Sequence, residues 1–170
     1  FPFAGYNPPM GLSKKGTTIG FIEGRSSGSV SACGYAGAAF SAAINVYGSD
    51  GTLLQSKSGN CPTAYLGNSD VGSFEIIPND ASAVYYATVS NLFISSDKKS
   101  VASFYTFPAN NTGMSDSLYV PASTKWTVQN YALLLNPNSG GDLQALFEVF
   151  AEDGKLVHSE TLTLKQHVVN

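Results

Sequence analysis

The chain has 170 residues, which is enough for one domain or two small ones. Only 12% of the residues are charged and the net charge is −3, with Arg25 as the single arginine, so clustered cations for binding nucleic acid or an anionic membrane surface are lacking. No apolar run approaches the roughly 20 residues that span a bilayer, so we expect no membrane span.

Residues 1–16 are predicted to form an extended segment, because three prolines and a lysine pair prevent regular strand pairing. Phe1 is not an initiator residue, so we expect a mature chain whose signal peptide was removed, or one trimmed at that point. Apolar residues near both ends are candidates for contact between subunits: Phe1, Pro2, Phe3, Tyr6, Val168 and Val169.

From residue 17 onward the pattern is typical of an all-β protein. Apolar and polar residues alternate, as in Phe147, Glu148 and Val149, and no stretch of ten residues keeps the spacing of an amphipathic helix. The predicted strands are Thr17–Glu23, Ala39–Gly48, Thr52–Lys57, Ser73–Ile77, Val84–Ser95, Val101–Phe107, Leu118–Val120, Thr127–Leu135, Leu143–Ala151 and Lys155–Leu164. This many short strands, separated by turn residues, predicts an antiparallel sandwich or barrel.

The two cysteines, Cys33 and Cys61, have neither a CxxC spacing nor a neighbouring histidine, so a zinc site is unsupported. We expect them to form a disulfide, and the alternative is two buried free thiols. Asn110 begins an Asn-Asn-Thr sequon, a candidate N-glycosylation site if the chain passes through a secretory pathway.

Two hairpin turns with the same chemistry indicate an internal pseudo-repeat. Asp50-Gly51 and Asp153-Gly154 each separate two apolar segments, and glycine tolerates the positive φ of tight hairpin turns. Residues 42–54 align without gaps on residues 145–157, and a similar strand precedes each hairpin. Two hairpins with Asp-Gly turns resemble each other in any case, but the matching order of three elements favours duplication.

The segment from Tyr131–Pro137 through Leu143–Phe150 to Val157–Leu164 resembles an immunoglobulin-like β-sandwich repeat of bacterial secreted and surface proteins. The resemblance covers the last quarter of the chain and implies an extracellular structural or adhesive setting, without supplying functional residues. The fold expected is an immunoglobulin-like or jelly-roll-like antiparallel β-sandwich over residues 17–170. Two immunoglobulin-like units, split near residues 78–82, are the alternative.

The sequence shows no catalytic motif and no cofactor or metal motif. His158 and His167 are the only histidines, no GxSxG elbow is present, and both histidines are interpreted as surface residues. The carboxylates fall in turns or on the polar side of strands, and no calcium-binding loop is present.

Aromatic residues are the remaining candidates for binding. Tyr85 and Tyr86 are adjacent on a predicted strand, so their rings point to opposite faces and one is expected to reach the surface. With Trp126, they are candidate contacts for a glycan or a protein. We expect a non-enzymatic extracellular structural or adhesive protein, such as a subunit of a surface filament that binds itself or another surface protein. The alternative is a carbohydrate-binding module.

Overall fold

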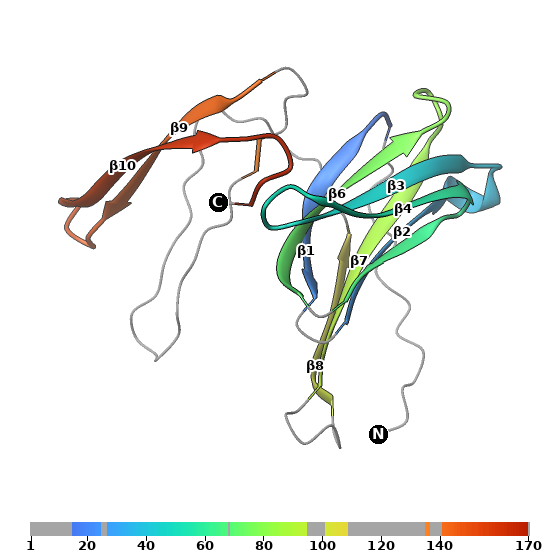
Figure 1. Cartoon of the computed structure of the whole chain (residues 1–170), viewed down its shortest axis with the longest axis horizontal. Helices are drawn as coiled ribbons and strands as arrows, with labels where there is room; N and C mark the ends of the chain where they lie inside the picture. The colour runs from blue at the N-terminus through green and yellow to red at the C-terminus, as the bar shows by residue number, and fades with distance from the viewer. Residues whose placement is uncertain are drawn as a thin grey trace.

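The computed structural model describes residues 15–24, 27–67, 69–94, 101–108, 135–136 and 141–169. These residues form ten strands and one turn of 3-10 helix, η1 (Figure 1). The elements are β1 (Thr18–Gly24), β2 (Ser27–Gly34), η1 (Tyr35–Gly37), β3 (Ser41–Gly48), β4 (Leu53–Asn60), β5 (Thr63–Leu66), β6 (Ser69–Pro78), β7 (Tyr85–Ile94), β8 (Val101–Pro108), β9 (Leu143–Phe150) and β10 (Leu156–Leu164).

The strands form three sheets. One has the order β1-β6-β3-β4 and a second has the order β5-β2-β7-β8, while β9 and β10 form a two-stranded sheet of their own. All neighbouring strands are antiparallel. The two four-stranded sheets pack face to face, and the β9–β10 hairpin stands beside them (Figure 1). The predicted all-β sandwich is therefore confirmed.

The core of the sandwich comes from alternate residues of strands in both four-stranded sheets. On β3, Ala42, Ile44 and Val46 are fully buried, and on β7 Tyr85 and Val89 face them from the other sheet. Side chains of one strand point to alternate faces, so each buried residue is followed by one that is less buried. Burying apolar surface contributes roughly 25 cal/mol per Å², which makes this layer the main source of stability.

Two strands of the sandwich lie outside the strands predicted from the sequence. β2 carries mostly glycine, serine and alanine, and β5 has only four residues, so neither shows a strong apolar alternation. Leu118–Val120 and nearly all of Thr127–Leu135 lie outside the described residues. The alternative boundary near residues 78–82 lies at the end of β6 and in the loop that leads to β7, and these two strands belong to the two facing sheets.

Tyr85 connects the start of β1 to β7 through a buried hydroxyl. Its hydroxyl donates to the backbone oxygen of Gly16 at 2.7 Å and also bonds the hydroxyl of Thr18, which is fully buried. Its ring stacks on Phe40 with the centroids 4.8 Å apart. Burial raises the pKa of Tyr85 above its ordinary value of 10.0, while the Thr18 hydrogen bond lowers it by less.

The predicted disulfide between Cys33 and Cys61 is confirmed. Cys33 lies on β2, and Cys61 lies in the loop where the chain passes from β4 in one sheet to β5 in the other. The bond therefore joins the two sheets at this end of the sandwich.

Replacing both Cys33 and Cys61 by serine should lower the free energy of unfolding by about 3–4 kcal/mol, because the bond closes a long loop in the unfolded chain. Urea denaturation of the double variant and of the oxidised parent measures the difference. Equal midpoints under oxidising conditions would contradict this role.

Tyr85→Phe should lower the free energy of unfolding by about 1–3 kcal/mol, because the buried Thr18 hydroxyl loses its hydrogen-bond partner. Tyr86→Phe is the control, since Tyr86 is half-buried, and it should change stability by less than about 0.5 kcal/mol.

The raised folded-state pKa of Tyr85 means that its contribution to the free energy of unfolding is present below pH 10.0 and is lost as the pH rises further, since the tyrosine of the unfolded chain ionises first. The Phe variant should lose less stability in this alkaline range, as followed by chemical denaturation at several pH values.

Candidate interaction surface

The β3–β4 and β9–β10 hairpins have the same turn. Gly48 N–H donates to Thr52 O at 2.9 Å in the first hairpin, and Ala151 N–H donates to Lys155 O at 2.8 Å in the second. Gly51 and Gly154 have φ angles of 83° and 82°, the left-handed conformation that glycine adopts without strain. Both turns are thus three-residue loops that end in a glycine bulge.

The two hairpins also share an irregularity two residues beyond the turn. Tyr47 pairs with Leu53 and Val46 with Gln55, which leaves Leu54 as an extra residue on β4. Phe150 pairs with Leu156 and Val149 with His158, which leaves Val157 as the extra residue on β10. Each of these residues in the second hairpin has a number 103 higher than its counterpart in the first, which is the same offset as in the sequence alignment. Turn, bulge and register therefore agree, while the duplication of a larger unit stays a prediction.

The surroundings of the two hairpins differ. β3 is bonded to β4 on one edge and to β6 on the other, and its inward side chains are fully buried in the sandwich. Within the described residues, β9 is bonded to β10 alone. Its edge away from β10 is open there, and an open edge offers unpaired N–H and C=O groups to another strand.

Apolar side chains are exposed on both faces of the β9–β10 hairpin. One face carries Phe147 and Val149, beside His158 and Glu160 of β10, whose side chains lie 3.5 Å apart. The other face carries Leu146, which is 64% exposed, among polar residues. The large exposed apolar residues of the hairpin are Leu143, Leu146, Val149, Phe150, Leu156 and Val157. Large apolar side chains exposed in this number on one hairpin are typical of an interaction surface.

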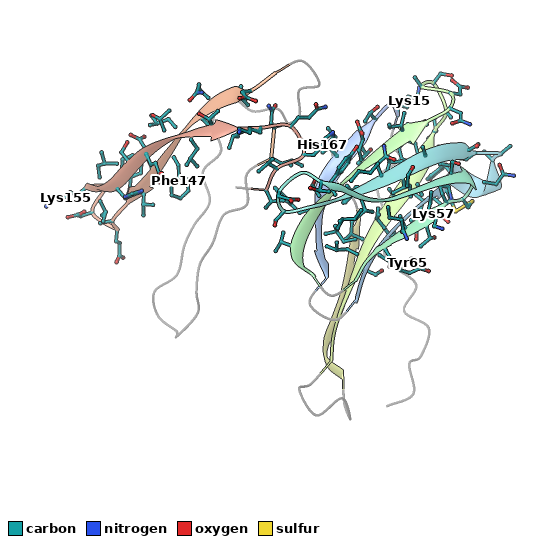
Figure 2. All side chains as sticks on the ribbon, viewed as in Figure 1. Lys15, Lys57, Tyr65, Phe147, Lys155 and His167 are labelled. Carbon is teal, nitrogen blue, oxygen red and sulfur yellow. A yellow bond between two sulfur atoms is a disulfide. The ribbon has the colours of Figure 1, made fainter. Side chains whose placement is uncertain are left out.

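The chain that follows β10 docks on the sandwich (Figure 2). The His167 ring stacks on Tyr47 of β3 with the centroids 3.8 Å apart, and the buried Ser73 hydroxyl donates to the His167 backbone oxygen at 2.8 Å. Tyr47 donates to Glu75 at 3.3 Å, and burial followed by the charge of Glu75 raises the pKa of Tyr47. Val169 N–H donates to Ser49 O at 2.9 Å. These contacts hold the base of the hairpin against the sandwich.

Asn136 completes the base of the hairpin. It is almost fully buried, and its side-chain amide donates to Gly141 O at 2.7 Å and to Leu164 O at 2.9 Å. Its backbone also forms an isolated parallel bridge with Gln166. The amide therefore satisfies carbonyl groups just before β9 and at the end of β10. Figure 2 shows Phe147 and Lys155 farther along the hairpin, away from the labelled residues of the sandwich.

The sequence-predicted contact residues lie in different places. Val168 and Val169 are half-buried beside the β3–β4 turn of the same chain, where their intersubunit role stays a prediction. Tyr85 is fully buried, so it cannot serve as the surface contact, whereas Tyr86 is half-buried. The other candidates lie outside the described residues: Phe1, Pro2, Phe3, Tyr6, Asn110 and Trp126.

Several exposed residues of this surface were missed by the sequence reasoning. Leu146 and Phe150 occupy positions of β9 where strict alternation would place polar residues. Apolar residues on the polar face of a strand indicate exposed apolar side chains, and this signal is present in the sequence. Tyr35 and Tyr65, which are 44% and 55% exposed, were also missed, because nothing in their sequence neighbourhood distinguishes them from core aromatics.

His158 is exposed, as interpreted from the sequence, but His167 is half-buried under its contact with Tyr47. Among the described residues, no three His, Cys, Asp or Glu side chains are grouped so that they could hold a metal ion. The same part of the chain contains no helix that is long and apolar enough to cross a membrane.

Comparisons with protein-family models, with curated proteins and with solved structures found no significant match to this chain.

Proposed function

We propose that the protein is a non-enzymatic extracellular structural or adhesive subunit that associates with other copies through β-strand contacts. The observation that carries the proposal is the β9–β10 hairpin, which has an open β9 edge within the described residues and large apolar side chains on both faces. Exposed strand edges pair readily with further strands, and exposed apolar area stabilises such contacts once it is covered.

An extracellular location is consistent with two further properties. The Cys33–Cys61 disulfide is favoured in oxidising compartments. Only 12% of the residues are charged, and most polar residues carry hydroxyl or amide groups, a composition consistent with a structural protein outside the cell. Both support the proposed setting without identifying a partner.

The alternative is a carbohydrate-binding module, for which Tyr65 is the relevant residue. Tyr65 lies on the edge strand β5 and is 55% exposed, and its backbone N–H donates to the Gln55 side chain at 2.7 Å. Flat aromatic rings beside amide groups are common in sugar sites. This arrangement involves one ring, whereas the apolar hairpin is an extended surface, so self-association is favoured.

Sedimentation velocity over a hundredfold range of concentration, together with negative-stain electron microscopy, tests the proposal. The full chain should form concentration-dependent oligomers or filaments, and deleting residues 1–10 should abolish the filaments while the β-type circular dichroism spectrum is retained. Glycan-array binding should show no saccharide preference. A chain that stays monomeric at all concentrations and binds one class of glycan would instead support the carbohydrate-binding module.

A further inference from the structure

We infer that the open edge of β9 pairs with β9 of a second copy, antiparallel and with Leu146 on the two-fold axis, so that two hairpins form one four-stranded sheet of order β10-β9-β9-β10. The inference rests on the proposed self-association and names the strand, the partner and the register.

The orientation of the backbone groups follows from the turn. Ala151 N–H donates across to Lys155, so residue 151 faces the second strand of its own hairpin. Backbone groups of an antiparallel strand point to its two sides at alternate residues. The N–H and C=O groups of Ala145, Phe147 and Val149 therefore point toward β10, and those of Gln144, Leu146 and Glu148 point to the open edge.

The β3–β4 hairpin shows how the same edge is used when a strand occupies it. β3 is the counterpart of β9 in turn, bulge and register, and its corresponding edge is bonded antiparallel to β6 along its whole length. There Ala43, the counterpart of Leu146, pairs directly with Ile77 of β6. The geometry of this hairpin is thus compatible with an added antiparallel strand at that edge.

A second copy of β9 is complementary to this edge in one register. With Leu146 opposite its own symmetry mate, the direct pairs join Ala145 to Phe147, Leu143 to Val149 and Gln144 to Glu148, while Phe150 at the end of β9 lies opposite Asp142. From Leu143 to Val149 apolar residues then face apolar residues, and the one acidic side chain of β9 faces an amide that can donate to it.

The neighbouring symmetric registers are poorer. An axis at Ala145 places Asp142 opposite Glu148, two carboxylates at close range. An axis at Phe147 places Leu146 opposite Glu148, so that neither side chain has a suitable partner. A two-fold pairing uses the same surface on both copies and is the commonest way in which identical chains associate.

Such a pairing closes a dimer and does not by itself extend into a filament. Growth beyond the dimer then requires a second contact, for which the N-terminal segment remains the candidate under the proposed function. The two contacts can be removed separately, so a failure of one does not imply a failure of the other.

Cysteine cross-linking of the full chain tests the register. In the proposed dimer the two Cα atoms of residue 146 lie about 5.5 Å apart, within the range that a disulfide spans, so oxidation of Leu146→Cys with diamide should give a covalent dimer in most molecules. Glu148→Cys is the matched control on the same face and edge. Its two Cα atoms would lie about 14 Å apart, so it should cross-link at least tenfold less.

A second pair of variants tests the affinity without a new thiol. Leu146→Lys places two ammonium groups at the axis and should raise the dimer Kd at least tenfold in sedimentation equilibrium. Leu54→Lys, at an exposed apolar position of β4 outside this hairpin, should leave the Kd unchanged within about twofold.

Equal cross-linking at residues 146 and 148, or an unchanged Kd for Leu146→Lys, would overturn the inference. If the parent and all variants still assembled in that case, the proposed self-association would stand and only its β9 register would be wrong. A parent chain that is monomeric at every concentration would overturn both.

Discussion

A β-strand must satisfy the hydrogen-bonding groups on both of its edges and cover its apolar side chains, and this constraint explains most of the structure. Within the sandwich it is met for β3, which has a strand on each side and buried side chains against the facing sheet. In the β9–β10 hairpin the same turn, bulge and register are present, but within the described residues one edge of β9 lacks a strand. The contrast between the two hairpins is the basis for the proposed association.

The sandwich has a second role, because it holds the base of the exposed hairpin. The His167 ring lies flat on Tyr47, and the Ser73 hydroxyl bonds the backbone of the same residue. Asn136 bonds carbonyl groups at both ends of the hairpin base. The exposed apolar residues therefore lie on a strand pair whose base is fixed by buried polar contacts. A fixed hairpin favours one register in the proposed pairing over nonspecific hydrophobic contact.

Much of the fold followed from the sequence, because period-two alternation and Asp-Gly turns are local signals. β2 was missed because its buried positions are filled by Val30 and Ala32 among serines and glycines, which give little contrast in hydrophobicity. Small residues are required there by neighbours that no local pattern reveals. At Gly34, for example, a Cβ would lie 1.9 Å from the Ala38 backbone oxygen.

The candidate surface was harder to predict than the fold. Whether Tyr85 or Tyr86 is buried depends on which face of β7 packs on the other sheet, and adjacent residues in one strand cannot decide this. His167 was interpreted as a surface residue because its contact with Tyr47 joins residues 120 positions apart. Leu146 is likewise exposed because no other described element packs over its face of the hairpin. The local sequence does not determine which tertiary contacts a strand makes.

Amide hydrogen exchange measured at low and high protein concentration is the most direct test of the pairing between two β9 strands, because it reports on single backbone groups of β9. The amides of Leu146 and Glu148, which point to the open edge, should become protected as the concentration rises, while that of Phe147, bonded within the hairpin, should be protected throughout. Amides of Leu146 and Glu148 that exchange at the same rate at both concentrations, in a chain that nevertheless associates, would contradict the pairing.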